Sequence, residues 1–216
     1  MRIPTKMNQL HDTVKKDVKA SVSSFGGLNI FFDDMPVSIS WESQKARLLF
    51  CCLLVTCDQW VHRQKIIEAV WPGSTYASGE KNFKTTLSRL RKSFSAVQGI
   101  TPVLAQGEAI RLNHLHVSAD ASDFKSNATQ GIKLLVRGEI KAARKCLEAA
   151  QDLYLGDFLP EEPNNSFIST ARLEYADTYA SVIKSLEKSY LLEGNLDALE
   201  VFSLLKNVPS VNLPCD

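Results

Sequence analysis

Apolar and polar residues alternate with a period of two across residues 28–32 and again across 37–41, on either side of a turn sequence at 33–36. Successive side chains of a strand point to opposite faces, so this period is typical of strands with one buried face. The two segments therefore predict a β-hairpin. Residues 1–24 have no complete apolar stripe, and we predict no ordered element for them.

The apolar period lengthens to that of an α-helix in the next three segments. Either Ser40 or Ser43 can cap a helix over 43–56, because a serine hydroxyl accepts a hydrogen bond from a free N–H of the first turn. A second helix is expected at 63–70, where a Trp-Pro-Gly sequence ends it because proline cannot continue a helix. A third helix is expected at 80–97.

The expected helix at 80–97 is amphipathic. At about 100° per residue, its apolar side consists of Phe83, Leu87, Leu90, Phe94 and Val97. Its other positions are basic or polar, namely Lys81, Asn82, Lys84, Thr85, Ser88, Arg89, Arg91 and Lys92. No acidic residue occurs between Lys81 and Gly107, so this face lacks the ion pairs that solvated helices use. Such a face suits phosphates and base edges; the alternative is an ordinary solvated surface.

Two short strands around a glycine turn follow that helix. Residues 102–105 and 109–112 are mainly apolar and flank Gln106, Gly107 and Glu108. Together with the hairpin and the three helices, they give the order strand, helix, helix, helix and wing. This order is typical of a winged helix-turn-helix.

After Asp120 the strand pattern ends, and the rest of the chain predicts helices alone. They are expected at 121–137, 139–155, 165–193 and 196–206. Similar glycine turns at Gly138 and Gly194 favour antiparallel helix pairs stacked as a short solenoid. The expected fold class is therefore α+β followed by all-α. Its expected divisions are a leader or linker at 1–25, a winged helix at 26–117 and a helical domain at 118–216.

The net charge of +1 hides two halves of opposite sign. Residues 1–118 hold 15 Lys and Arg against 9 Asp and Glu, a balance of +6, whereas residues 119–216 hold 10 against 15, a balance of −5. This asymmetry indicates halves with different partners. No apolar run approaches the roughly 18–20 residues of a membrane span, and no signal-peptide pattern opens the chain. We therefore expect a cytoplasmic protein without a membrane partner.

The sequence carries no signature of an enzyme. Phosphate-binding loops, dinucleotide-binding glycines, nucleophile elbows and zinc-protease motifs are all missing, so we expect neither enzymatic activity nor a cofactor. His114 and His116 are interpreted as exposed loop residues, and Glu161-Glu162, which lies between two prolines, as part of a solvated loop.

The cysteines are odd in number and irregular in spacing: Cys51, Cys52, Cys57, Cys146 and Cys215. No Cys-x-x-Cys pair supplies the usual zinc-ligand spacing, so buried cytosolic thiols are expected. A metal or redox sensor that also uses His62 is the alternative.

The order of several short motifs resembles a known family of regulators. Residues 26–115 resemble the OmpR/PhoB-type winged helix, in the version fused to a bacterial transcriptional activator domain (BTAD) in SARP-like regulators. The resemblance in the first half rests on Trp41, residues 45–49, residues 66–72, Asn82-Phe83 and residues 87–92. In the second half it rests on Asp120, Asp123-Phe124, residues 153–159 and residues 172–174.

The resemblance implies a DNA-binding surface. The third helix would lie in the major groove and the wing would reach the minor groove. The residues expected at this interface are Lys81, Lys84, Thr85, Ser88, Arg89, Arg91, Lys92 and Arg111. Family position also implies Thr86, but the helical wheel puts Thr86 nearer the core. Many relatives carry an arginine just before the wing glycine, where this chain has Gln106-Gly107-Glu108, and Glu108 would be repelled by phosphates. Arg111 either replaces that contact or lies on the outer face of the sheet.

The function that follows is a sequence-specific, double-stranded DNA-binding transcriptional regulator, an activator by resemblance. Its TPR-like helical half, which looks short for a BTAD, would serve oligomerisation or partner contacts. The partners implied are promoter repeats in double-stranded DNA, RNA polymerase and further copies of the chain. The chain also suits the C-terminal part of a larger regulator. The alternative is a protein-interaction module whose winged helix is a scaffold that no longer binds DNA.

Overall fold

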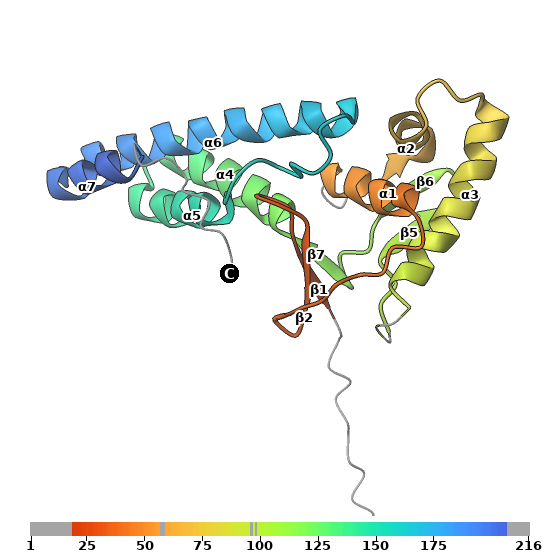
Figure 1. Ribbon diagram of the computed structural model, residues 1–216. Helices are drawn as coiled ribbons and strands as arrows, with labels where there is room; N and C mark the ends of the chain where they lie inside the picture. Colours follow the sequence, from red (N-terminus) through yellow and green to blue (C-terminus); the bar gives the residue numbers. More distant parts are fainter. Residues whose placement is uncertain (1–18, 57–58, 96, 98, 207–216) are drawn as a thin grey trace, which may run out of the picture.

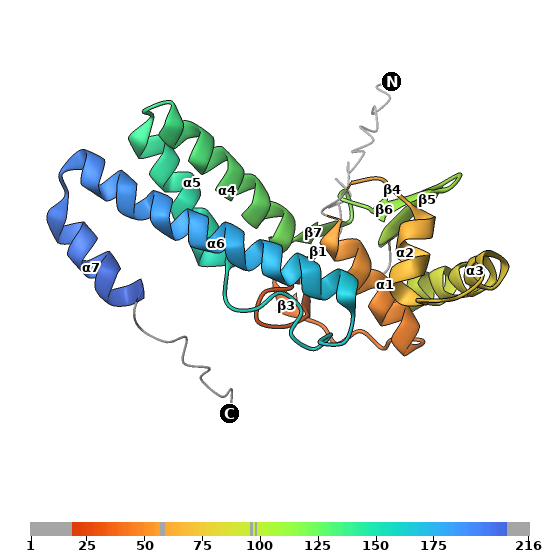
Figure 2. The same cartoon turned by 90° about the horizontal axis from the view of Figure 1, so that it is seen from above.

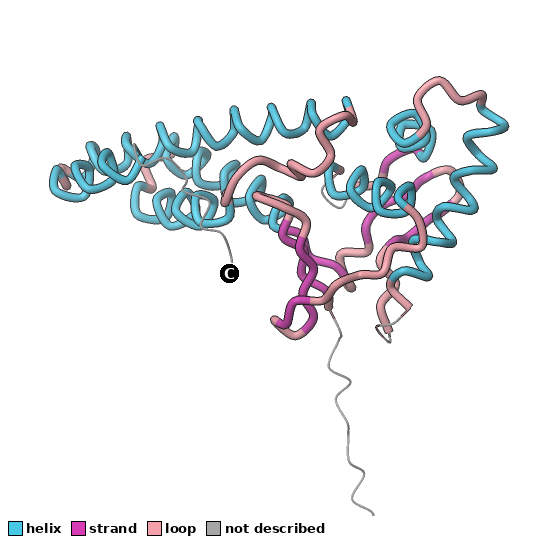
Figure 3. Tube along the Cα trace, in the orientation of Figure 1, coloured by secondary structure: helices cyan, strands magenta, loops and turns pink. Residues whose placement is uncertain are grey.

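The computed structural model describes residues 19–56, 59–95, 97 and 99–206. Its strands gather in two separate small sheets, one beside the long helices of the second half and one beside the helices of the first half (Figure 3). Within the described residues, no helix is both long enough and apolar enough to cross a membrane.

The first sheet joins strands from both ends of the winged-helix segment. It contains β1 (Ala20–Ser23), β2 (Asn29–Phe32), β3 (Met35–Pro36) and β7 (Val117–Ala119), in the order β3-β2-β1-β7. β1 and β7 are parallel, and all other pairs are antiparallel. The expectation of no ordered element before residue 25 was wrong for β1. A four-residue strand leaves little periodicity to read, and its partner β7 is distant in the sequence.

The predicted hairpin exists, but its second strand is shorter and earlier than expected. Asp33 and Asp34 both have positive φ, at 48° and 63°, and form a two-residue turn that pairs Phe32 with Met35. The segment 37–41 was expected to be a strand and is not one. Beyond β3, only the backbone N–H of Val37 continues the ladder, by donating to Ile30 O at 2.8 Å.

The three expected helices of the first half are present. They are α1 (Gln44–Val55), α2 (Arg63–Val70) and α3 (Tyr76–Ser93), and the short β4 (Val61–His62) precedes α2. Ser43 caps α1, since its side chain accepts from the N–H of Ala46. Of the two serines that the sequence left open, the structure therefore selects Ser43.

The third helix is displaced by about one turn from the predicted 80–97. Thr75 caps α3 through the N–H of Ser78, and Phe94 forms its C-cap instead of continuing it. Gly79 lies inside the helix, where a Cβ atom would stand 2.5 Å from Ile67 Cγ2 on α2. The glycine, which disfavours helix by propensity, therefore allows α2 and α3 to approach closely.

The wing has the predicted form. β5 (Val103–Gln106) and β6 (Ala109–Leu112) are antiparallel, and with β4 they make the second sheet in the order β4-β6-β5. Gln106 ends β5, and Gly107 has a φ of 57°, a left-handed conformation that favours glycine.

The second half consists of helices at the predicted places. They are α4 (Asp120–Val136), α5 (Ile140–Leu153), α6 (Ser166–Glu193) and α7 (Leu196–Lys206). Gly138 and Gly194 have φ values of 80° and 68° at the two turns. α4, α5 and α6 pack side by side, and α7 folds back on the end of α6 (Figure 2).

A cluster of aromatic rings joins the first sheet to the helical half. Phe25, which follows β1, is 2% exposed. The rings within 6 Å of its ring centroid are Phe124, Tyr154, Phe158 and Tyr175. The same end of β1 is held by Asp120, whose carboxylate accepts from the backbone N–H groups of Ser24 (2.7 Å) and Phe25 (3.1 Å) and from the Ser24 hydroxyl.

Polar contacts connect the helices of the first half to the loop that precedes α6. Arg47 on α1 forms an ion pair with Glu162, and Leu28 N–H donates to Glu161 Oε1 at 2.8 Å. Glu161 and Glu162 lie in a loop, as interpreted from the sequence, and Glu161 is exposed, but both carboxylates also hold residues from the first half. Asn165 Nδ2 also donates to Ala69 O, at the end of α2, at 2.8 Å.

Two cysteines lie in the core of the first half. Cys51 and Cys52 on α1 are fully buried free thiols, and burial raises the pKa of Cys52 to about 12 and the pKa of Cys51 further. Cys146 is a free thiol of intermediate exposure, while Cys57 and Cys215 lie outside the described residues. The structure therefore agrees with buried thiols at the first two positions.

We expect the native protein at pH 8 to be alkylated by iodoacetamide at Cys146 and not at Cys51 or Cys52, because the thiolate is the reactive form. The raised pKa of Cys52 also gives a pH dependence. In the unfolded chain the thiol has a pKa of about 8.5, and below this pH the contribution of Cys52 to the free energy of unfolding is complete. This contribution is lost as the pH rises towards 12. Peptide mapping by mass spectrometry, and denaturation at pH 8 and pH 10, check the two statements. Alkylation of Cys52 at pH 8 in folded protein would contradict the first.

Candidate nucleic-acid interface

The face of α3 that points away from the core carries the predicted site residues of this helix. Phe83, Leu87 and Leu90 are buried against the other helices. Thr86 is 5% exposed, so its assignment to the core side is confirmed. The exposed positions are Lys81, Asn82, Lys84, Thr85, Ser88, Arg89, Arg91 and Lys92. α3 lies along the outer edge of the molecule, away from the long helices (Figure 1).

Most cations on this face have no acidic partner within the part of the chain that the structure describes. Among the described residues, Lys81, Lys84, Arg89 and Arg91 take part in no ion pair. Lys92 pairs with Glu42 at 3.0 Å, but its side chain is 68% exposed, and a surface pair of this kind contributes little free energy. The face therefore presents unneutralised positive charge to a partner.

Hydroxyl groups lie between these cations. Thr85 Oγ1 donates to Lys81 O at 3.2 Å, which leaves its lone pairs exposed, and Ser88 is exposed one turn further on. Mixed Lys, Arg, Thr and Ser side chains on one helix face can bind phosphates and the edges of bases.

Arg111 lies apart from this face. Its neighbours in β6, Ile110 and Leu112, are fully buried, so Arg111 projects from the opposite side of the sheet. There its guanidinium carbon lies 4.7 Å from the ring centroid of Trp60. Of the two positions that the sequence left open, the structure places Arg111 on the outer face of the wing sheet, and its role in DNA contact stays a prediction.

Glu108, which was expected to repel phosphates, is paired. Its carboxylate is 3.0 Å from His62 Nε2 and 3.6 Å from Arg63 Nη2. Sequence reasoning missed both partners, since they are 46 and 45 residues away and belong to β4 and α2. The pairing of β4 with β6 brings the start of α2 beside the wing and so places the three residues together.

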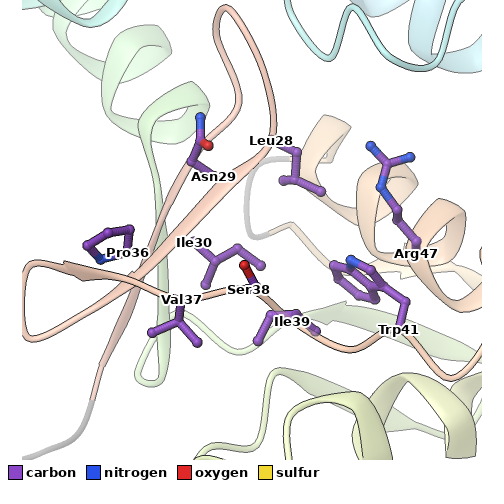
Figure 4. Close-up of a pocket in the computed structure, with 9 residues that line it drawn as sticks. All are labelled: Leu28, Asn29, Ile30, Pro36, Val37, Ser38, Ile39, Trp41 and Arg47. Atoms are coloured by element: carbon purple, nitrogen blue, oxygen red, sulfur yellow. The ribbon is translucent and has the colours of Figure 1, made fainter. Parts of the chain in front are cut away.

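A groove of about 440 Å³ lies between β2, the segment 36–41 and α1. Figure 4 shows that Leu28, Ile30, Ile39 and Trp41 line it, with Arg47 at one end, and Arg47 is already paired with Glu162. Within the described residues, no group of three or more His, Cys, Asp or Glu side chains could hold a metal ion. The metal-sensor alternative also involves Cys57, which lies outside the described residues.

Comparison with known proteins gives a similarity of fold. No family model matches the chain, and no curated protein matches its sequence. A solved structure, Mycobacterium tuberculosis EmbR in complex with a low-affinity phosphopeptide, matches with a TM-score of 0.66 and 18% sequence identity. The match covers 85% of this chain and 48% of the EmbR chain, so it spans about half of that protein's length. The predicted fold class is confirmed: a winged-helix region of mixed α/β structure, then a region of long helices.

Proposed function

We propose that the protein is a sequence-specific, double-stranded DNA-binding transcriptional regulator that acts as an activator and has no enzymatic activity. The observation that carries the proposal is the exposed face of α3, on which Lys81, Lys84, Arg89 and Arg91 have no acidic partner among the described residues. In a winged helix, the helix at this position enters the major groove while the wing lies beside it. The fold shared with EmbR supports the arrangement of these elements.

Each charged or hydroxyl-bearing side chain on this face has an assigned role in the proposal. Lys81, Thr85, Ser88 and Arg89 read bases or groove edges, because they follow one another along the exposed side of α3. The phosphate anchors are Lys84, Arg91 and Lys92, which flank that side. Arg111, on the wing sheet, contacts the DNA backbone. Stacking of its guanidinium on the Trp60 ring fixes the direction of the side chain.

The helical half is proposed to arrange regulators on DNA. It would act as a TPR-like BTAD of the SARP-like regulators, with oligomerisation on promoter repeats and contact with RNA polymerase as its tasks. Contacts at the junction, such as Arg47–Glu162 and Asn165–Ala69, support a fixed orientation of this half relative to α3. We also propose that the chain acts as part of a larger regulator in the cytoplasm.

Selection from a random pool of double-stranded DNA tests the proposal. We expect one enriched motif, and a binding constant for it that falls steeply between 50 and 200 mM salt, because each neutralised phosphate releases about 0.9 counterion. The logarithm of the binding constant should fall with the logarithm of salt concentration with a slope of about −3 or steeper if three anchors act. Absence of any enriched sequence at low salt would overturn the proposal.

That outcome would favour the second candidate, a protein-interaction scaffold whose winged helix no longer binds DNA. The observation that favours it is the wing turn, where Glu108 is 57% exposed and the turn residues Gln106, Gly107 and Glu108 include no basic residue. A scaffold would also bind the selected pool and an unselected pool equally weakly.

A further inference from the structure

Arg63, the first residue of α2, connects the wing turn to α3. Its Nε donates to Glu80 Oε1 on α3 at 2.7 Å, and its Nη1 donates to Gly107 O in the wing turn at 3.0 Å. The Arg63 side chain is 22% exposed and the Glu80 side chain 14%. The contact between Arg63 and Glu80 is therefore partly shielded from solvent, which strengthens it relative to a fully exposed ion pair.

The same turn is held by two further contacts of Arg63. Its backbone N–H donates to Glu108 O at 2.8 Å, and its Nη2 lies 3.6 Å from Glu108 Oε1. The other Glu108 oxygen is 3.0 Å from His62 Nε2. Backbone and side-chain contacts thus converge on residues 107 and 108, where a two-residue connection would otherwise be free to bend.

The guanidinium suits this position because of its shape. It presents several N–H donors in fixed, coplanar directions, so it can hold Glu80 on one edge and Gly107 on another. A lysine ammonium has the same charge but is a single point that cannot span both partners. The pKa of Arg63 is raised, mainly by the hydrogen bond to Glu80, so the group stays cationic.

We propose that Arg63 is a positioning residue for DNA binding, which holds the wing turn at a fixed place relative to α3. The inference rests on the proposed function, since two separated elements must meet one duplex together. It also gives Glu108 a role: its carboxylate belongs to the network that fixes the wing. Glu80 has the same role at the other end, although it is an acid at the edge of a DNA-binding face.

Two variants and two matched controls test the role. Arg63→Lys keeps the charge and removes the planar group, and Glu80→Ala removes the partner on α3. Glu68→Ala on α2 removes an exposed acid that accepts a hydrogen bond from Gln64 Nε2, and Arg137→Lys repeats the arginine change at an exposed position after α4. Circular dichroism and thermal unfolding show whether each variant is folded.

The first readout needs no DNA. We expect amide hydrogen exchange at residues 106–109 to accelerate by about tenfold or more in Arg63→Lys and Glu80→Ala, because local opening of the wing becomes easier. Exchange in the two controls should match the wild type. Unchanged exchange in both test variants would overturn the positioning role.

The second readout is affinity for the selected duplex. Loss of an acid should by charge alone strengthen binding, and we expect this for Glu68→Ala. For Glu80→Ala we expect the opposite change, a loss of affinity of about tenfold, and we expect a similar loss for Arg63→Lys. In both variants the wing is displaced from the duplex, and the lost wing contacts account for a loss of affinity of about this size. If Glu80→Ala binds at least as tightly as Glu68→Ala, the inference is wrong. Failure of the proposed function would show differently, as wild-type protein that binds no duplex.

Discussion

Replacing Arg89 and Arg91 together with alanine is expected to weaken binding to the selected duplex by about tenfold or more, since the base contact assigned to Arg89 contributes about 1–3 kcal/mol and Arg91 adds a phosphate contact. Both side chains are exposed on α3 and take part in no ion pair among the described residues. Their removal therefore subtracts DNA contacts without breaking an internal network. Fluorescence anisotropy over a series of salt concentrations measures the loss.

The single variants should separate base reading by Arg89 from phosphate anchoring by Arg91. Arg91→Ala should lower the salt slope by about 1 for all sequences, whereas Arg89→Ala should also relax the preference at one base position. Arg137→Ala, which removes an exposed arginine after α4, is the matched control and should leave affinity nearly unchanged. Wild-type affinity in the double variant would show that α3 is not the recognition helix.

Phe25→Ala is expected to lower the free energy of unfolding by about 3–5 kcal/mol, the usual cost of removing a large ring from a packed core. Phe25 is 2% exposed. Its ring centroid lies 5.9 Å from that of Phe158 in the loop and 5.2 Å from that of Tyr175 on α6, and the centroids of Phe158 and Tyr175 are 4.8 Å apart. Since these rings join the first sheet to the helical half, the loss should affect both halves together.

Urea denaturation followed by circular dichroism measures this effect. Phe31→Ala, on a half-buried strand position of β2, is a control that should cost less. Should the two substitutions cost the same, the ring cluster is not a principal joint between the halves. A second transition appearing only in Phe25→Ala would show that the halves have separated.

The sequence predicted the elements whose apolar residues repeat with the period of a helix. The helices of the second half are long, and their expected ranges agree with α4 to α7 to within two residues. α2 was placed at its observed bounds, Arg63–Val70. The start of α3 was misplaced because Gly79 reads as a helix breaker, whereas the structure uses it for close packing against Ile67.

Elements that depend on distant partners were not predictable in this way. β1 and β7 have four and three residues, and each is stabilised by the other across the chain. The candidate interface likewise has features that follow from local sequence and features that depend on distant residues. Exposure along α3 follows from helical geometry, and Thr86 was correctly assigned to the core. The pairing of Glu108 with His62 and Arg63 depends on how β4 meets the wing, which no local pattern contains.

The contact between Ser24 and Asp120 has a consequence for the order of folding during synthesis. These residues are 96 positions apart, and the parallel pairing of β1 with β7 closes the same long loop. β1 can pair with β2 soon after it leaves the ribosome, but its pairing with β7 waits until nearly a hundred further residues have been added. At about 5–20 residues per second, that interval is on the order of 5–20 s. The three helices and the wing have time to assemble first, and the first sheet closes only as α4 begins to emerge.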